Sequence, residues 1–272
     1  NENSNIFINK KILIYGIGKT GISAFNFLKR HNDISLFDDN KKIRLKNPFK
    51  NKFILFNQIK KFKFDLIILS PGVNINQCKL KNFLKKNFKI IYTDLDIFFS
   101  FYKNQCITIT GTNGKSTSCQ LLYEVLKKNG HDVKLAGNIG YPILSTKNIK
   151  RKSIFVIEAS SYQLDYSKLF ATKYAVILNI APDHLERHKT LKNYIIAKYK
   201  LIQNQEKGSI AFINKYDKYL QKEIKKNKNK SKIIKVETNL KNEIINAFQN
   251  NYFSSVSNKE NLAFVVEIAK KF

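Results

Sequence analysis

The sequence predicts an α/β fold with mostly parallel sheets, arranged as two domains. Short β-branched runs alternate with helical patterns along most of the 272 residues, which is typical of βαβ units. Two of these runs lead into glycine turns that precede a helix, and this repeated order indicates two anion-binding units. A chain of this length can bury a core in each domain. We therefore expect a Rossmann-like domain over residues 1–103 and a P-loop NTPase-like domain over residues 104–272.

The first domain is predicted to alternate strands and helices around one glycine turn. The turn reads Gly-Ile-Gly-Lys-Thr-Gly at residues 16–21 and precedes a helix over residues 22–29. We place the boundary with the second domain at residues 102–104. Strands are predicted over residues 11–15, 34–37, 66–69 and 90–92, and a short helix over residues 95–99.

The glycine turn of the first domain predicts a site for a diphosphate. The pattern G-x-G-x-x-G between a strand and a helix, followed by Asp38 at the end of the next strand, is a dinucleotide fingerprint. The same helix N-terminus binds any diphosphate, including that of a UDP-sugar, so the turn indicates an anion rather than a nicotinamide. Ser70, Pro71 and Gly72 at another strand end either add a second wall to this crevice or form a plain tight turn.

The second domain begins with the most specific motif of the sequence, a phosphate-binding loop. An apolar run leads into Gly-Thr-Asn-Gly-Lys-Ser-Thr, and a helical pattern follows from Cys119. The glycines let backbone N–H groups turn toward an anion, Lys115 reaches the β- and γ-phosphates, and Ser116 offers its hydroxyl to Mg²⁺. The loop is shorter than the general P-loop, which has a glycine where this chain has Ile109. We expect a nucleoside triphosphate to be bound by Gly111, Thr112, Asn113, Gly114, Lys115, Ser116 and Thr117.

Later strands are predicted over residues 154–157, 174–178 and 209–213, and polar residues follow the first two of them. Glu158 is well placed to ligate Mg²⁺ beside a P-loop serine, although an ordinary strand-end acid is an equal alternative. Asp183 and His184, in the polar loop after the next strand, favour a functional over a structural interpretation. Beyond Lys215 the sequence is polar and predicts little until a final helix, which is expected to start after Asn258 and to run into the C-terminus.

Composition limits the remaining function classes. The formal net charge of +29 comes from lysines spread along the whole chain, and the densest run, residues 222–232, is interpreted as a solvated helix end and loop. No aromatic residues interleave with that run, so we expect no nucleic acid partner. The three cysteines lack metal-ligand spacing and indicate a reducing compartment. No apolar run is long enough for a membrane span and no signal peptide is recognised, so we expect a cytoplasmic protein without a membrane partner.

These motifs together resemble the Mur ligase family, the ATP-dependent amide ligases of peptidoglycan precursor synthesis. The resemblance runs in order through GIGKTG, LSPGV, TGTNGKST, GNIGYP, EASSYQLD, LNIAPDHLERH, IIAKYKLI and SNKENLA, and it covers the first domain and nearly all of the second. It implies the two-domain fold described above. GNIG, EASSYQLD and GIGKTG resemble the members that add D-glutamate to UDP-N-acetylmuramoyl-L-alanine through an acyl phosphate, so both substrates are expected partners.

The resemblance implies a catalytic group around the phosphate loop. Lys115 is expected to hold the phosphates of ATP, while Ser116 and Glu158 hold one Mg²⁺ ion. His184 and Lys198 are expected to serve a second Mg²⁺ ion. Carbamylation of Lys198 by CO₂ is implied as well, and it would turn a cationic donor into an anionic oxygen ligand.

The resemblance also implies residues that contact the substrates. The residues near the reacting carboxylate are expected to be Asn138 and Ser160, and Gln163 is expected to bind substrate as well. The residues near the adenine are expected to be Asn258 and Asn261. The uridine diphosphate is expected to be lined by Gly18, Thr20, Asp38, Ser70, Pro71 and Gly72.

Two features depart from the family pattern. Ser257 stands where a histidine is expected before the adenine-contacting asparagine, and the chain is expected to lack the third, C-terminal domain of the family. The alternatives are therefore a truncated, non-catalytic remnant that binds nucleotide or UDP-sugar, or another Mur or folylpolyglutamate-type ligase. We expect a monomer.

Overall fold

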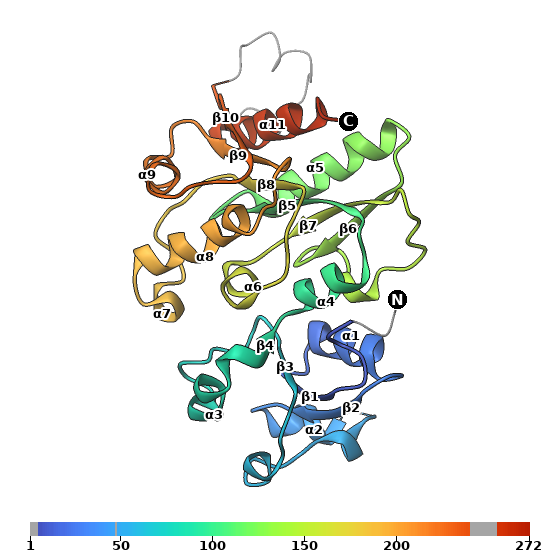
Figure 1. Ribbon diagram of the computed structural model, residues 1–272. Helices are drawn as coiled ribbons and strands as arrows, with labels where there is room; N and C mark the ends of the chain where they lie inside the picture. Colours follow the sequence, from blue (N-terminus) through green and yellow to red (C-terminus); the bar gives the residue numbers. More distant parts are fainter. Residues whose placement is uncertain (1–4, 47, 240–254) are drawn as a thin grey trace. The chain divides into compact units, whose positions relative to one another are not determined.

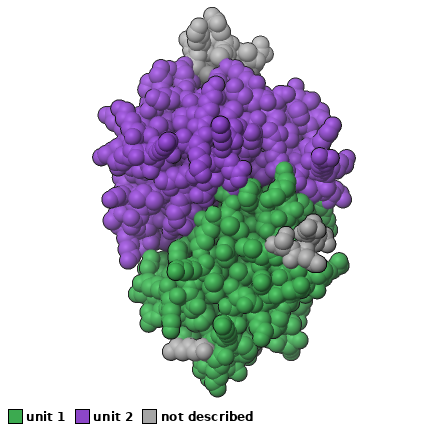
Figure 2. All heavy atoms as spheres, viewed as in Figure 1, with its two compact units in different colours: residues 1–103, 142–147, 166–170 green, residues 104–141, 148–165, 171–272 purple. Residues whose placement is uncertain are grey.

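The computed structural model describes residues 5–46, 48–239 and 255–272, which belong to two compact units. Unit 1 comprises residues 1–103, 142–147 and 166–170, and unit 2 comprises residues 104–141, 148–165 and 171–272 (Figure 2). Two short segments from beyond residue 103 thus pack with unit 1. Contiguity in sequence alone does not define either unit.

Unit 1 is built on a four-stranded parallel sheet with the order β2-β1-β3-β4 (Figure 1). Its central strand β1 carries a continuous apolar run that is buried on both faces, as parallel sheets covered by helices require. The strands are β1 (Lys11–Tyr15), β2 (Asp33–Phe37), β3 (Leu66–Leu69) and β4 (Ile91–Tyr92). The helices and 3₁₀ turns are α1 (Lys19–Leu28), α2 (Lys41–Lys46), η2 (Lys50–Lys52), η3 (Ile59–Lys61), α3 (Lys81–Lys86), η4 (Phe88–Ile90), α4 (Asp94–Phe101) and η5 (Ile143–Ser145).

Asp96 explains why residues 166–170 belong to unit 1. This fully buried carboxylate closes a capping box at the start of α4, where its Oδ2 accepts from the backbone N–H of Thr93 at 2.9 Å. Its Oδ1 accepts from Ser167 Oγ at 2.7 Å and from the backbone N–H groups of residues 168–170. One carboxylate therefore fastens a segment that lies more than 70 residues away in the sequence.

Unit 2 is built on a six-stranded parallel sheet with the order β10-β9-β8-β5-β7-β6. Its first strand, β5, lies between β7 and β8, so that β6 and β7 lie on one side of β5 and β8, β9 and β10 lie on the other. The strands are β5 (Gln105–Thr110), β6 (Val133–Gly137), β7 (Ile154–Glu158), β8 (Tyr174–Ile177), β9 (Ile210–Asn214) and β10 (Lys232–Val236). The helices are α5 (Lys115–Lys128), α6 (Ser161–Tyr166), α7 (Leu185–His188), α8 (Leu191–Gln203), α9 (Lys218–Lys226) and α11 (Val256–Ala269).

The core of unit 2 joins the sheet to α5 and α11, which pack against each other (Figure 1). Leu122 of α5 and Phe264 of α11 lie in one cluster of buried residues with Ile107 and Val176 of the sheet. Parallel strands buried on both faces are expected to read as apolar runs, and β5, β7 and β8 do so.

The structure confirms the α/β fold with mostly parallel sheets and corrects several element boundaries. Strands β6 and β10 were not expected, because lysines interrupt both. The basic run at residues 222–232 enters the sheet at its end, since Lys232 begins the edge strand β10. Helix α11 starts at Val256 and is capped by Ser255, earlier than expected, and it ends before the last residue. Among the described residues, no helix is long and apolar enough to cross a membrane.

Candidate active site

The candidate site lies where β5, β7 and β8 end, at the carboxyl edge of the unit 2 sheet. Ligands of open α/β sheets bind at this edge, where strand order reverses. The phosphate loop leaves β5, Glu158 is the last residue of β7, and the loop that carries Asp183 and His184 follows β8. Three strand ends thus bring together residues that are far apart in the sequence.

Gly114 is required by both the conformation and the packing of the phosphate loop. Its φ of 80° is in the left-handed region, which glycine adopts without a steric cost, and it is the N-cap of α5. A Cβ at this position would lie 2.2 Å from Asn261 Oδ1, on the buried side of α11. Asn261 is thereby placed against the loop, whereas Asn258 lies in the first turn of the same helix and is half-buried.

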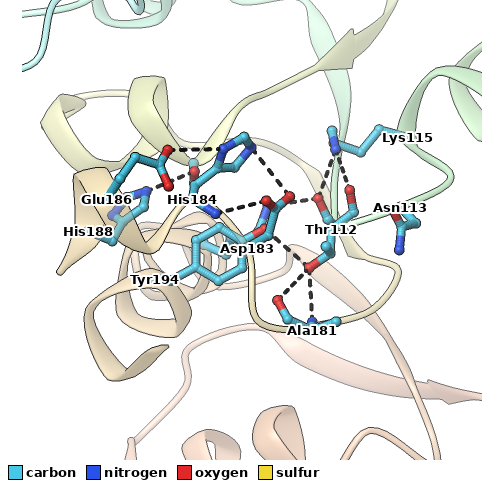
Figure 3. Close-up of polar contacts among 12 residues, drawn as sticks. Thr112, Asn113, Lys115, Ala181, Asp183, His184, Glu186, His188 and Tyr194 are labelled. Atoms are coloured by element: carbon cyan, nitrogen blue, oxygen red, sulfur yellow. Dashed lines mark hydrogen bonds and ion pairs between the residues drawn. The ribbon is translucent and has the colours of Figure 1, made fainter. Parts of the chain in front are cut away.

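The phosphate loop bonds to the residues that follow β8 and to Tyr194 of α8. The backbone N–H groups of Thr112 and Asn113 both donate to Asn179 Oδ1, at 3.1 and 2.9 Å. Thr112 Oγ1 lies within hydrogen-bond distance of the backbone N–H and carbonyl of Ala181 and 3.1 Å from the Tyr194 hydroxyl (Figure 3). Thr112 and Asn113 therefore connect the phosphate loop to the segment after β8, and Thr112 also connects it to α8.

Lys115 lies on the loop itself. Its ammonium donates to the carbonyl oxygens of Gly111 at 3.0 Å and of Thr112 at 2.8 Å (Figure 3). Because these carbonyls are part of the loop, the positive charge sits at the N-terminus of α5, where the helix dipole also favours an anion.

Ser116 and Glu158 form a paired oxygen site. The Ser116 hydroxyl donates to Glu158 Oε2 at 2.7 Å, and it joins the exposed start of α5 to a carboxylate that is 5% exposed. A hydroxyl and a carboxylate beside a phosphate loop are oxygen donors of the kind that Mg²⁺ prefers. These two residues therefore fit the first expected metal site.

Lys198 is buried beneath the loop on α8. Its ammonium donates to the Gly111 carbonyl at 2.8 Å and to Thr110 Oγ1 at 3.2 Å, and it lies 4.7 Å from the centre of the Tyr194 ring. Burial, together with repulsion from Lys115, lowers the pKa of Lys198 to about 7. The lowered pKa favours the neutral amine, which is the form that reacts with CO₂.

The turn after β8 presents His184. Its ring lies 3.5 Å from Asp183 Oδ2 and 3.7 Å from Glu186 Oε1, and its side chain is 43% exposed (Figure 3). Its backbone is left-handed, with φ of 52°, and Lys189 at the other end of α7 has φ of 68°. In the part of the chain that the structure describes, no three His, Cys, Asp or Glu residues gather as a metal cluster. The second expected metal site thus stays a prediction.

The predicted substrate-binding residues of unit 2 follow two adjacent strands, β6 and β7. Ser160 and Gln163 bond to each other at the start of α6, where Ser160 Oγ and N both donate to Gln163 Oε1 at 3.2 Å. Asn138 is exposed just after β6, and its backbone N–H donates to the Glu158 carbonyl at 3.1 Å. The roles of all three residues toward a substrate stay predictions.

The glycine turn of unit 1 is closed by side chains from the two neighbouring strand ends. Asp38 Oδ2 accepts from the backbone N–H of Ile17 at 2.7 Å, and Ser70 Oγ donates to the Gly16 carbonyl at 2.6 Å. Asp38 and Ser70 therefore shape the turn directly. A Cβ on Gly18 would meet nothing within 4 Å, so the space in front of this turn is open.

The other predicted residues of that site surround the turn. Thr20 is half-buried in the first helical turn of α1, and Pro71 and Gly72 directly follow Ser70 at the end of β3. Their contacts with a uridine diphosphate stay predictions.

Three residues that organise the site were not predicted from the sequence. Asn179 and Tyr194 bond to the phosphate loop, and His188 Nε2 lies 2.9 Å from Ser161 Oγ. Burial lowers the pKa of His188. Asn179 comes two residues after β8, and a polar residue so close to a strand end is a usable signal, whereas Tyr194 and His188 are recognised only once the helices are placed.

Comparison with known proteins identifies both parts of the chain. Residues 109–270 match the family described as Mur ligase middle domain, and residues 10–92 match the family described as Mur ligase MurD-like, N-terminal domain. The first match covers the phosphate loop and every strand end described above for unit 2.

Curated relatives agree with these matches. A UDP-N-acetylmuramoylalanine–D-glutamate ligase of Rickettsia bellii (strain RML369-C) is 43% identical over 76% of this chain and 47% of its own length. Relatives of the same name are 41% identical in Rickettsia prowazekii (strain Madrid E), over 80% of this chain and 49% of the relative, and 34% identical in Caldicellulosiruptor bescii (strain ATCC BAA-1888 / DSM 6725 / KCTC 15123 / Z-1320), over 79% and 49%. The chain spans about half the length of these relatives.

A solved structure supports the fold. The crystal structure of UDP-N-acetylmuramate:L-alanyl-gamma-D-glutamyl-meso-diaminopimelate ligase (MPL) from Neisseria meningitides aligns with a TM-score of 0.53 at 18% identity. The alignment covers 84% of this chain and 78% of that one. On the family matches and the relatives together, the chain belongs to the Mur ligase family.

Proposed function

We propose that the chain forms the UDP-sugar-binding and ATP-binding parts of a ligase that adds D-glutamate to UDP-N-acetylmuramoyl-L-alanine. The observation that carries the proposal is the presence of both family matches on one chain, each over a glycine loop at the carboxyl edge of a parallel sheet. Relatives that are 41–43% identical to this chain are named UDP-N-acetylmuramoylalanine–D-glutamate ligase. A folylpolyglutamate-type ligase is disfavoured, because the MurD-like N-terminal match precedes the phosphate loop.

The proposed reaction has two steps that divide between the two substrates. The carboxylate of UDP-N-acetylmuramoyl-L-alanine attacks the γ-phosphorus of ATP, and ADP leaves, which gives an acyl phosphate. The amine of D-glutamate then attacks the activated carbonyl, loses a proton and expels inorganic phosphate. The chain's own contribution is to position the phosphates and to neutralise their charge.

Three residues around the loop support the first step. Lys115 already sits among the loop carbonyls, so a phosphate entering the loop finds a cation and the N-terminus of α5 together. Ser116 and Glu158 would hold Mg²⁺ between the loop and β7. When bound, Mg²⁺ would stabilise negative charge on the transferring phosphoryl group.

Lys198 is proposed to carry a carbamate. Its neutral amine would attack CO₂, form an N–C bond and release one proton, which leaves an anionic carboxylate on the side chain. Burial favours the neutral amine and hence this reaction. The carbamate would then serve, with His184, a second Mg²⁺ ion. Partial rescue of a Lys198→Ala variant by short carboxylates would support this role, and full activity of that variant without them would contradict it.

Unit 1 is proposed to bind the uridine diphosphate moiety in front of its glycine turn. The open space at Gly18 and the N-terminus of α1 support this placement. We also propose that the protein works as a monomer in the cytoplasm.

The test is phosphate release from ATP by the product of the complete gene. Release is expected only when UDP-N-acetylmuramoyl-L-alanine and D-glutamate are both present. Equal release with L-lysine in place of D-glutamate, or with a folate substrate, would contradict the assignment.

A further inference from the structure

His188 lies where three segments of the candidate site meet. Its Nε2 is 2.9 Å from Ser161 Oγ, and both side chains are buried. Its backbone N–H donates to the His184 carbonyl at 3.0 Å, and its own carbonyl accepts from Asn193 Nδ2 at 2.9 Å. One residue is therefore bonded to α6, to the His184 turn and to α8.

The turn that ends at His188 has an uncommon backbone. His184 and Lys189, which bracket α7, both have left-handed φ values, of 52° and 68°. Residues other than glycine keep such conformations where surrounding contacts over-determine them. The bonds made by His188 are contacts of this kind.

Two tyrosines fix the orientation of the imidazole. The Tyr162 ring is nearly parallel to it, with centroids 5.5 Å apart and an interplanar angle of 21°. The Tyr194 ring meets it at 62°, with centroids 5.3 Å apart. Because the Tyr194 hydroxyl lies 3.1 Å from Thr112 Oγ1, the same cluster reaches the phosphate loop.

We propose that His188 is a positioning residue that holds the His184 turn against α6. Ser161 follows Glu158 by three residues, so the bond from His188 to Ser161 also fixes the segment that carries this carboxylate. His188 would thus set the separation of His184 and Glu158 without touching a substrate. This inference rests on the proposed function, in which both residues serve Mg²⁺.

The test is the Mg²⁺ dependence of ADP binding to this chain, measured by isothermal titration calorimetry at stepped Mg²⁺ concentrations. His188→Phe keeps an aromatic ring but removes the bond to Ser161. It is expected to raise the Mg²⁺ concentration for half-maximal binding about tenfold, because residues that orient metal ligands have effects of this size. ADP affinity without Mg²⁺ is expected to stay unchanged.

Two further variants separate positioning from general damage. Ser161→Ala removes the other half of the bond and is expected to act like His188→Phe. The double variant is expected to need no more Mg²⁺ for half-maximal ADP binding than the more impaired of the two single variants. His188→Gln places an amide near the position of Nε2 and is expected to recover part of the loss. His131→Phe makes the same change at a half-buried histidine before β6 and is expected to have no effect.

An unchanged Mg²⁺ requirement in His188→Phe would overturn the inference. So would an equal loss of ADP affinity with and without Mg²⁺, or additive effects in the double variant. If His188→Phe does not fold, Ser161→Ala and His188→Gln decide the same question. If the unmodified chain binds no ADP, the proposed function fails and the positioning role fails with it.

Discussion

The two glycine loops of this chain share a backbone plan and differ in side-chain chemistry. Each follows the first strand of a parallel sheet and precedes a helix. The unit 1 turn is shaped by Asp38 and Ser70, whose bonds go to its own backbone. The unit 2 loop instead gathers Lys115 and the Ser116–Glu158 pair.

The difference in side chains suits the unit 1 turn to binding an anion and the unit 2 loop to the proposed phosphoryl transfer. Side chains that bond to the unit 1 turn are a carboxylate and a hydroxyl, and we propose that the N-terminus of α1 receives a diphosphate there. The unit 2 loop has a cation, a pair of oxygen donors and, below it, a buried amine whose pKa is lowered. A glycine loop alone therefore indicates a phosphate, and the residues around it indicate the chemistry.

The largest expected effect is on nucleotide binding by Lys115→Ala. Loss of the ammonium removes charge-assisted bonds to phosphate, so ADP affinity is expected to fall about 100-fold. Isothermal titration with MgADP measures the change. Lys127→Ala, an exposed lysine in the last turn of the same helix, is the matched control and is expected to bind normally. Unchanged affinity in Lys115→Ala would refute the phosphate-loop assignment.

The glycines of the two loops are expected to differ in what they contribute. Gly114→Ala is expected to lower the free energy of unfolding by about 2 kcal/mol or more, because the residue is left-handed and its Cβ would overlap Asn261. Gly18→Ala has an ordinary φ of −79° and open space, so little change in stability is expected. Urea denaturation distinguishes the two. Equal losses of unfolding free energy in the two variants would contradict the expected difference between the glycines.

A pH-dependent stability is expected from Lys198. Its folded pKa of about 7 lies below the unfolded value of 10.5, so between these limits the unfolded state binds more protons and stability rises with pH. Relative to Lys198→Met, the unmodified chain is expected to gain about 2 kcal/mol between pH 7 and pH 9 in CO₂-free buffer. A difference that stays flat or falls over this range would show that the amine keeps its proton.

The smallest expected effects concern two serines: Ser70, which bonds to the unit 1 turn, and Ser116, which belongs to the unit 2 loop. Ser70→Ala removes a buried bond to the Gly16 carbonyl and is expected to cost about 1 kcal/mol of unfolding free energy. Ser116→Ala is expected to weaken Mg²⁺-dependent ADP binding about tenfold, because it removes one of the two oxygen donors proposed for Mg²⁺. Thermal unfolding and titration calorimetry on both variants check the pair. The reverse pattern would contradict the comparison.

Much of the fold followed from the sequence because buried parallel strands read as apolar runs. β1, β3, β5, β7 and β8 were recognisable in this way. The strands β6 and β10 were not, because lysines interrupt them and only pairing with a neighbour decides their conformation. The role of Asp96 could not be predicted from the sequence either, because Ser167, which donates to its carboxylate, lies 71 residues away.

The candidate site was predictable where the backbone itself makes it. Gly114, Lys115 and Ser116 are fixed by local spacing, and Glu158 by its place at a strand end. Lys198 became recognisable only through the family resemblance, because nothing local marks one lysine among many. His188 and Tyr194 act through contacts between helices, and sequence spacing does not encode these contacts.

The most direct test of the account is a crossed titration of two ligands against one variant in each loop. MgADP and UDP are titrated separately into the unmodified chain, Lys115→Ala and Gly18→Val. We expect Lys115→Ala to lose MgADP binding and keep UDP binding, and Gly18→Val to keep MgADP binding and lose UDP binding. Loss of both ligands in either variant that remains folded, or loss of neither, would contradict the division of roles between the two loops.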